Sequence, residues 1–186
     1  PRFCEGLVGW AAASAPSVGK SKWARQMNEV GSLKDRVAVV TGGASGIGAA
    51  CARLMAARGA RVVIADVNAD AARKVANEIG GLGYTVDVRD ADAIEALAEQ
   101  SEREVGPTDI LVTSAGIVQA PLPPEELPLE LYDNVIAVNL RGTYLTAVAY
   151  GLRMLKRRTG SIVTISSVTA ERSVPLHAYA PSKAAV

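Results

Sequence analysis

Two residues near the end of the chain, Tyr179 and Lys183, carry side chains that together can transfer a proton. Residues four apart on a helix share one face and lie one turn from each other. A free tyrosine, with a pKa of about 10, is a poor base at neutral pH, but a neighbouring ammonium group favours the phenolate. The pair could therefore carry acid–base chemistry. Taken in isolation, however, the spacing favours an ordinary exposed helix face that happens to carry both residues.

The glycine-rich segment TGGASGIG, residues 41–48, is the second feature that points to chemistry. It lies between a β-branched run and an apolar helical pattern, where a strand would turn into a helix. Gly42 permits the tight turn, Gly46 lets the backbone approach a diphosphate, and Gly48 lets the helix pack closely. The helix N-terminus would offer free N–H groups to the phosphates. The segment thus predicts a dinucleotide site.

Asp66 closes the next β-branched run, where a carboxylate can accept hydrogen bonds from the hydroxyls of an adenosine ribose. The same carboxylate would repel a 2′-phosphate, and neither Ala44 nor Val67 supplies a cation to offset the repulsion. We therefore expect NAD rather than NADP. An aspartate that caps a helix or is merely solvated is the alternative.

The elements that must position these residues alternate between strand and helix patterns. The patterns predict strands at residues 36–41, 61–66, 84–88 and 161–167, and a strand that leads into a glycine turn at 108–116. They predict helices at 47–59, 68–81, 90–106, 129–158 and from about Ala178 onward. Asn68 is the expected cap of the second helix. Such alternation favours an α/β fold with a doubly wound parallel sheet, the Rossmann fold, covered by helices on both faces.

Composition bounds the class of protein. The chain has 186 residues, of which 49% are hydrophobic, and a net charge of +1. These values favour one α/β domain and no partner among nucleic acids or membranes. Cys4 and Cys51 fit no metal-ligand or redox spacing, which favours a reduced cytoplasmic setting without a bound metal. Residues 1–32 are expected to be a poorly ordered or non-native extension, and residues 33–186 to form the dinucleotide-binding and catalytic domain.

In chain order, the motifs TGGASGIG, Asp66, Asp87-Val88, SAG at 114–116, Asn139, the serine pair and Tyr179-x-x-x-Lys183 resemble the short-chain dehydrogenase/reductase superfamily. The resemblance covers residues 33–186. The resemblance implies a cofactor site made of Gly42, Ser45, Gly46, Ile47, Gly48, Asp66, Asp87, Val88, Ser114, Ala115, Gly116, Tyr179 and Lys183. It implies that hydride moves between NAD(H) and a secondary alcohol or ketone while Tyr179 exchanges a proton with the substrate oxygen. Lys183 would also hold the nicotinamide ribose. Asn139 would accompany a helix distortion and bind water in a proton relay.

The serine that the resemblance requires is one of a pair, Ser166 and Ser167. Counting along the strand gives Ser167, and counting back from Tyr179 gives Ser166. A one-residue deletion in the loop explains both counts, and because loops tolerate deletion better than strands, we assign Ser167. The other serine is expected to face the packing side.

Thr113 and Pro181 depart from the usual pattern of the superfamily, and His177, the single histidine, is a separate candidate residue. Thr113 stands where the superfamily has an asparagine, which its hydroxyl is expected to replace in part. Pro181 is tolerated only in a first helical turn, so it predicts that the helix starts close to Tyr179. His177 lacks a partner at ligand spacing and is expected to border the substrate pocket or to lie in the loop.

The superfamily continues past the tyrosine-bearing helix, so the resemblance predicts a fold that is incomplete on its C-terminal side. It also predicts that this fragment binds NAD poorly and turns over little. The complete protein would be a homodimer or homotetramer. Two alternatives stay open: an inactive or regulatory NAD-binding homologue, and an epimerase- or dehydratase-type relative. The three-residue gap in TGGASGIG favours a dehydrogenase over the tighter GxxGxxG of such relatives.

Overall fold

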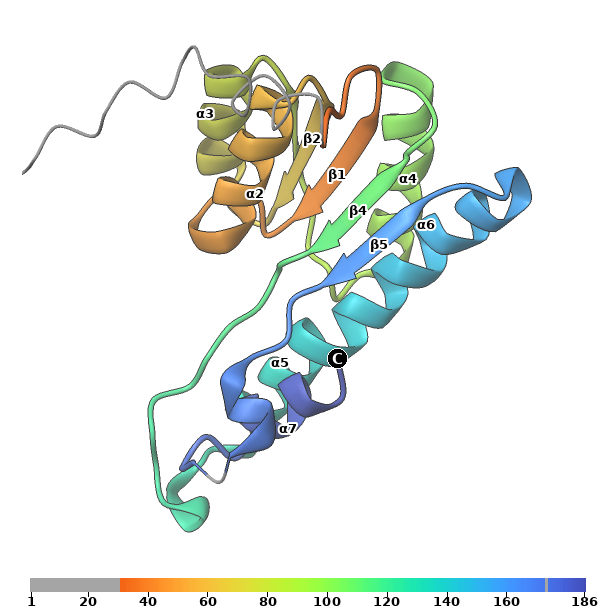
Figure 1. Cartoon of the computed structure of the whole chain (residues 1–186). Helices are drawn as coiled ribbons and strands as arrows, with labels where there is room; N and C mark the ends of the chain where they lie inside the picture. Colours follow the sequence, from red (N-terminus) through yellow and green to blue (C-terminus); the bar gives the residue numbers. More distant parts are fainter. Residues whose placement is uncertain (1–30, 173) are drawn as a thin grey trace, which may run out of the picture. The chain divides into compact units, whose positions relative to one another are not determined.

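The computed structural model describes residues 31–172 and 174–186, and a five-stranded parallel sheet forms the centre of residues 33–186 (Figure 1). The strand order is β3-β2-β1-β4-β5. The strands are β1 Val37–Thr41, β2 Arg61–Asp66, β3 Leu82–Thr85, β4 Ile110–Thr113 and β5 Ser161–Thr164. This arrangement confirms the predicted α/β fold with a doubly wound parallel sheet.

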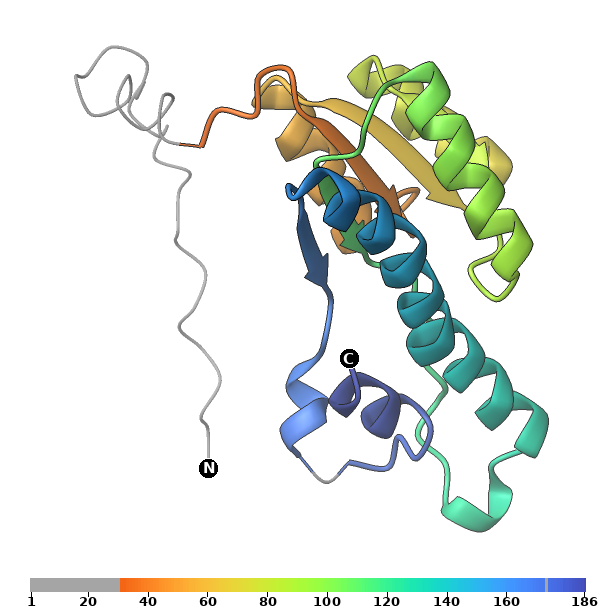
Figure 2. The ribbon, with the colours of Figure 1, turned by 90° about the vertical axis from the view of Figure 1, so that its right-hand side faces the viewer.

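Helices cover both faces of the sheet. Helices α2 (Gly46–Ala57) and α3 (Ala69–Ile79) lie on one face, and α4 (Ala91–Glu104) and α6 (Thr143–Arg157) pack side by side on the other (Figure 2). The central strand β1 is buried along its whole length, and its alternate residues enter two separate cores. A strand buried on both faces needs apolar residues at every position, which explains the continuous β-branched run.

The cap predicted for α3 is present. Asn68 accepts a hydrogen bond from Ala71 N at 3.0 Å through its side-chain oxygen, and Gly80 ends the helix in the left-handed conformation with a φ of 67°. Both ends of α3 are therefore fixed by local sequence.

The predicted position of the third strand is wrong by two to three residues, because β3 spans Leu82–Thr85 rather than residues 84–88. Gly83 lies so close to α3 that an added Cβ would be 2.9 Å from the Ala72 carbonyl oxygen. Only glycine permits this approach, so Gly83 is a packing position within β3 and not part of the turn that ends α3.

The helix predicted at residues 129–158 is interrupted. Helix α5 (Leu129–Ile136) leads into a π-helical turn, Ala137–Gly142, before α6 begins. The distortion that the resemblance implies at Asn139 is therefore present. A π-helical turn inserts an extra residue into a helix and often occurs at functional sites.

The strands β4 and β5 are shorter than predicted, and the chain after each runs on beyond the edge of the sheet. There, the 3-10 turns Pro124–Glu126 and Val168–Glu171, helix α5 and the short helix α7 (Tyr179–Ala184) gather (Figure 1). No helix in the described part of the chain is long and apolar enough to cross a membrane. Of the predicted extension 1–32, all but Gly31 and Ser32 lie outside the described residues, so this division stays a prediction.

Candidate active site

The glycine-rich segment forms the turn between β1 and α2. Gly42 has a φ of 66°, and an added Cβ would lie 2.5 Å from Ala115 N in the neighbouring β4 segment. An added Cβ on Gly48 would collide with the carbonyl oxygen of Gly42. Gly46 differs from both: its φ is 51°, but an added Cβ would meet no atom of the described residues within 4 Å. The turn therefore needs Gly42 and Gly48 for packing, whereas Gly46 leaves open space above the start of α2.

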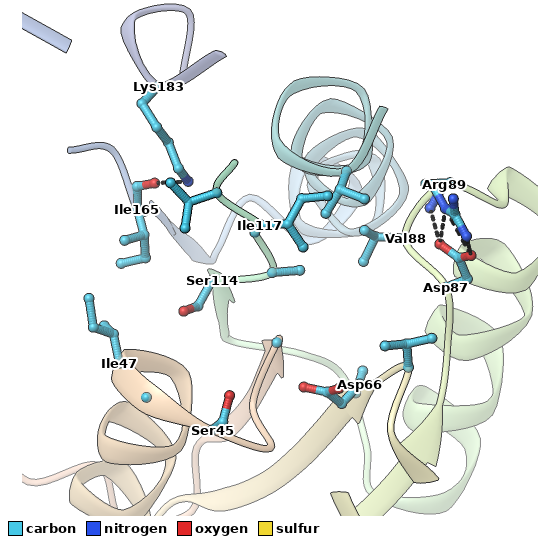
Figure 3. A pocket seen from close by; sticks show the side chains of 18 of the residues that line it. Ser45, Ile47, Asp66, Asp87, Val88, Arg89, Ser114, Ile117, Ile165 and Lys183 are labelled. Atoms are coloured by element: carbon cyan, nitrogen blue, oxygen red, sulfur yellow. Dashed lines mark hydrogen bonds and ion pairs between the residues drawn. The ribbon is translucent and has the colours of Figure 1, made fainter. Parts of the chain in front are cut away.

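A cavity of about 680 Å³ opens at this place, at the carboxyl ends of the strands (Figure 3). The predicted cofactor residues line it with one exception, Gly48, which lies in the first turn of α2. The volume falls within the range of about 300–1,000 Å³ that is usual for small-molecule sites. The position matches the crevice in which doubly wound sheets bind ligands.

Asp66 lies at the end of β2 and faces the cavity (Figure 3). Its Oδ2 accepts a hydrogen bond from Ala44 N at 3.1 Å, and its Oδ1 accepts one from Asn68 N at 3.0 Å. The carboxylate therefore fixes the glycine-rich turn and the start of α3, and it still borders the cavity. A local structural role of this kind was part of the alternative to cofactor binding that the sequence left open for Asp66.

Arg89 is a cavity residue that the sequence analysis missed (Figure 3). Its guanidinium binds both carboxylate oxygens of Asp87 at 2.6–3.0 Å and donates to Asn134 Oδ1 at 2.8 Å. The guanidinium holds the pKa of Asp87 below its usual range. A basic residue directly after Asp87-Val88 was the only signal in the sequence. Arg89 brings a cation to the same cavity as Asp66.

The predicted proton-transfer pair lies at the opposite wall of the cavity. Helix α7 begins at Tyr179, as Pro181 predicts, and Lys183 Nζ lies 5.9 Å from the centre of the Tyr179 ring. Lys183 is 5% exposed, and its Nζ donates to the carbonyl oxygen of Ile165 at 2.7 Å (Figure 3). Burial lowers the pKa of the Lys183 ammonium.

Asn139 is fully buried in the π-helical turn and does not line the cavity. Its side chain accepts from Ile117 N at 2.8 Å and donates to Ile117 O at 2.9 Å and to Ser182 Oγ at 3.0 Å. An added Cβ on Gly116 would lie 3.3 Å from Asn139 Oδ1 and 3.5 Å from Lys183 Nζ. The bare backbone at Gly116 therefore lies between these two side chains. The water relay assigned to Asn139 stays a prediction.

The two serines after β5 both line the cavity, so the expectation that Ser166 faces the packing side is wrong. Ser166 Oγ donates to the carbonyl oxygen of Lys183 at 2.6 Å. Ser167 Oγ accepts from Thr169 N at 3.2 Å and from Thr169 Oγ1 at 2.9 Å. The proton of Ser166 is therefore committed to the backbone of α7, whereas the structure describes no acceptor for the proton of Ser167.

The structure also bears on the expectations for Thr113 and His177. Within the described residues the buried hydroxyl of Thr113 has no hydrogen-bond partner, so the prediction that it replaces an asparagine is wrong. His177 lines a second cavity of about 540 Å³, together with Pro121, Leu122, Pro123, Pro124, Val174 and Pro175. The described residues contain no cluster of acidic, His and Cys side chains that could hold a metal.

Comparison with known proteins places these features in one family. The family profile described as short chain dehydrogenase matches residues 36–186. D-threitol dehydrogenase of Mycolicibacterium smegmatis is 43% identical over 157 residues, which are 81% of this chain and 60% of that protein.

Two solved structures are similar in fold. A structure from Brucella melitensis described as ribose-5-phosphate isomerase is 45% identical with a TM-score of 0.81, and the match covers 83% of this chain and 60% of that one. A short-chain type dehydrogenase/reductase from Mycobacterium marinum is 32% identical with a TM-score of 0.78, covering 82% of this chain and 63% of that one. The chain thus spans about 60% of the length of these relatives.

Proposed function

The chain belongs to the short-chain dehydrogenase family, and from that membership we propose that its protein transfers a hydride between NAD(H) and a secondary alcohol or ketone. The observation that carries the proposal is one cavity with two kinds of wall. Asp66 and the glycine-rich turn form one wall, and Tyr179, Lys183 and Ser167 form the other. This arrangement suits a dinucleotide that lies across the carboxyl ends of the strands, with its reactive end beside the tyrosine.

The residues present fit NAD. The open space above Gly46 and the free N–H groups at the start of α2 suit a diphosphate. Asp66 suits the two hydroxyls of an adenosine ribose, and Asp87 and Val88 border the place for the base. When bound, the nicotinamide supplies or accepts the hydride.

The proton chemistry belongs to the chain itself. Tyr179 exchanges a proton with the substrate oxygen, and the nearby Lys183 ammonium stabilises negative charge on the phenol oxygen. Lys183 is held in place by the Ile165 carbonyl oxygen and lies where it can also bind the nicotinamide ribose. Ser167 orients the substrate oxygen through its hydroxyl proton, which has no acceptor among the described residues.

The choice between the two serines is directly testable. We expect Ser167→Ala to lower kcat by about a hundredfold, the usual effect of removing one donor from a reacting oxygen. Ser166→Ala should lower kcat less, because the Ser166 hydroxyl is already bonded to the Lys183 carbonyl oxygen. Steady-state kinetics of the two variants provide the comparison. A larger loss in Ser166→Ala would transfer the role to Ser166.

The preference for NAD is proposed to rest on Asp66. We expect Asp66→Ala combined with Val67→Arg to shift the ratio of NADH to NADPH affinity by at least about tenfold toward NADPH. The double change exchanges a repulsion for a charge-assisted bond to phosphate. Val67 is 70% exposed, so an arginine there has room to reach the ligand. The control is Asp70→Ala combined with Val67→Arg, which removes an exposed acid nearby but leaves Asp66. An unchanged ratio in the Asp66 variant would contradict the assignment.

The first experiment on function uses the complete protein, because the 186-residue chain is expected to bind NAD poorly and to turn over little. It is a titration with NADH and NADPH followed by nicotinamide fluorescence, together with a turnover assay on secondary alcohols. We include polyols in the panel because a relative is named for D-threitol. Saturable NADH binding and NAD-dependent oxidation of at least one alcohol would support the proposal. NADH binding without turnover on any substrate would favour a regulatory NAD-binding homologue instead.

A second candidate function is internal redox chemistry that leaves the cofactor unchanged, as in an epimerase or isomerase. One similar structure is described as an isomerase, which gives this candidate a specific basis. Net formation of NADH with substrate supports the dehydrogenase. Conversion of substrate without net NADH supports the alternative.

The proposed assembly is a homodimer or homotetramer that works in the cytoplasm. Exposed apolar side chains recur along α6 at Tyr144, Val148, Leu152 and Leu155, and their spacing places them on one helix face. A second copy of the chain would cover this face. Light scattering after size exclusion gives the mass that tests it.

A further inference from the structure

We propose that Gln119 is a positioning residue for Tyr179, whose backbone it holds through a hydrogen bond to the first turn of α7. Gln119 Oε1 accepts from Tyr179 N at 3.1 Å, and the glutamine is only 4% exposed. It follows β4 by a few residues and lies 60 positions before Tyr179 in the sequence. The proposal rests on the acid–base role proposed for Tyr179.

Helix α7 needs such a partner because its own sequence provides few hydrogen-bond acceptors for its first N–H groups. The first N–H groups of a helix have no acceptor inside the helix. Ala178, at the cap position, makes no side-chain hydrogen bond, and Pro181 has no N–H at all. Ala180 N donates to Leu176 O at 2.9 Å, which leaves Tyr179 N for Gln119. A helix of six residues is too short to be stable alone, so tertiary contacts decide where it begins.

The peptide group on the other side of Tyr179 is held as well. Ser182 Oγ donates to Tyr179 O at 2.7 Å and in turn accepts from Asn139 Nδ2 at 3.0 Å. Asn139 also bonds both backbone groups of Ile117, two residues before Gln119. Two routes therefore run from Asn139 to Tyr179: one is hydrogen-bonded throughout and passes through Ser182, and the other continues along the backbone from Ile117 to Gln119. Together they fix both ends of the residue whose side chain faces the cavity.

Only the oxygen of the Gln119 amide contributes to this contact. Gln119 Nε2 is buried and has no hydrogen-bond partner in the described part of the chain, which is unfavourable for a donor. A leucine would fill similar space without that penalty, so space filling alone does not account for a glutamine. Gln119 lines neither of the cavities described above. Its effect on turnover must therefore pass through Tyr179 rather than through contact with a ligand.

The first test needs no variant and no activity. Amide hydrogen exchange of the wild-type chain, followed by NMR, should show Tyr179 N–H protected to the same degree as Ala180 N–H. Exchange of Tyr179 at the rate of an unstructured peptide would overturn the proposal. Because this measurement does not depend on turnover, it separates a failure of the positioning role from a failure of the proposed function.

The second test compares Gln119→Leu with Gln119→Glu, which keeps an acceptor for the N–H. Gln119→Leu should speed exchange of the Tyr179 amide about tenfold, as expected for loss of one ordinary hydrogen bond. It should lower kcat about tenfold while the KM for NAD stays the same, and Gln119→Glu should restore most of both. The control is Gln100→Leu on α4, whose amide bonds only Glu104 at the surface. If Gln119→Leu folds but leaves the exchange of Tyr179 unchanged, the positioning role is refuted; if it does not fold, the wild-type exchange decides.

Discussion

Replacing Tyr179 by phenylalanine is expected to lower kcat by about a thousandfold, within the range of about 10²–10⁴ that general acid–base catalysis contributes. The substitution removes one hydroxyl and leaves the ring under Lys183 Nζ, which lies 5.9 Å from its centre. The affinity for NADH should therefore change by no more than about twofold, because the aromatic contact with the ammonium remains. Kinetics and NADH titration of the same preparation measure the two quantities.

The matched control for this variant is Tyr132→Phe. Tyr132 lies on α5 with 37% of its surface exposed, and it lines neither of the described cavities. This variant should keep the wild-type kcat. Full turnover in Tyr179→Phe would remove the tyrosine from the mechanism, and an equal loss in both variants would point to damage of the fold instead.

Replacing Lys183 by methionine is expected to lower kcat by about a hundredfold, as does the loss of a fixed group that stabilises developing charge. Methionine has similar length and fills the same buried space, but it cannot donate to the Ile165 carbonyl oxygen. NADH affinity should also decrease, because Lys183 lines the cavity and is proposed to hold the ribose. Lys156→Met, which removes an exposed ammonium from the last turn of α6, is the control that should change neither quantity. Wild-type turnover and NADH affinity in Lys183→Met would rule out this role.

The same variant has a separate consequence for stability against pH. Burial lowers the pKa of Lys183 in the folded chain, so between the folded and the ordinary value the unfolded chain binds more protons. The free energy of unfolding of the wild type must then rise with pH across that interval. Lys183→Met lacks this contribution, so the wild type should gain stability relative to the variant as the pH rises toward the ordinary lysine pKa of about 10.4. Urea unfolding over a series of neutral to alkaline pH values measures the difference, and a difference that stays constant would contradict a lowered pKa of Lys183.

The sequence predicted the central sheet well because its signals are local. Each β-branched run is bounded by glycines or polar caps, and a helix that begins at Asn68 and ends at Gly80 carries both of its boundaries in its own residues. The error at β3 arose where a glycine, Gly83, is used for close packing against α3 rather than for a turn. Periodicity cannot distinguish these two uses of glycine.

The prediction of the candidate site was less complete, because some of its contacts depend on the fold and not on local sequence. Most of the residues singled out for the cofactor and for proton transfer do line one cavity. Gln119 escaped notice because its hydrogen-bond partner, Tyr179, lies 60 positions later in the sequence. Arg89 escaped notice because only the fold brings it to the cavity, where it bonds both the nearby Asp87 and the distant Asn134. The unsatisfied hydroxyl of Thr113 also depends on what surrounds β4, which no local pattern reports.

The strand order β3-β2-β1-β4-β5 also relates the geometry of the site to the direction in which a ribosome makes the chain. The strands that carry the glycine-rich turn, Asp66 and the segment at Ser114 all precede residue 117. A ribosome makes the N-terminal part of a chain first. The residues of the wall that we propose for the dinucleotide are therefore all present in the nascent chain before helix α7 is added, and the pair proposed for proton transfer is synthesised last among the residues proposed for the site.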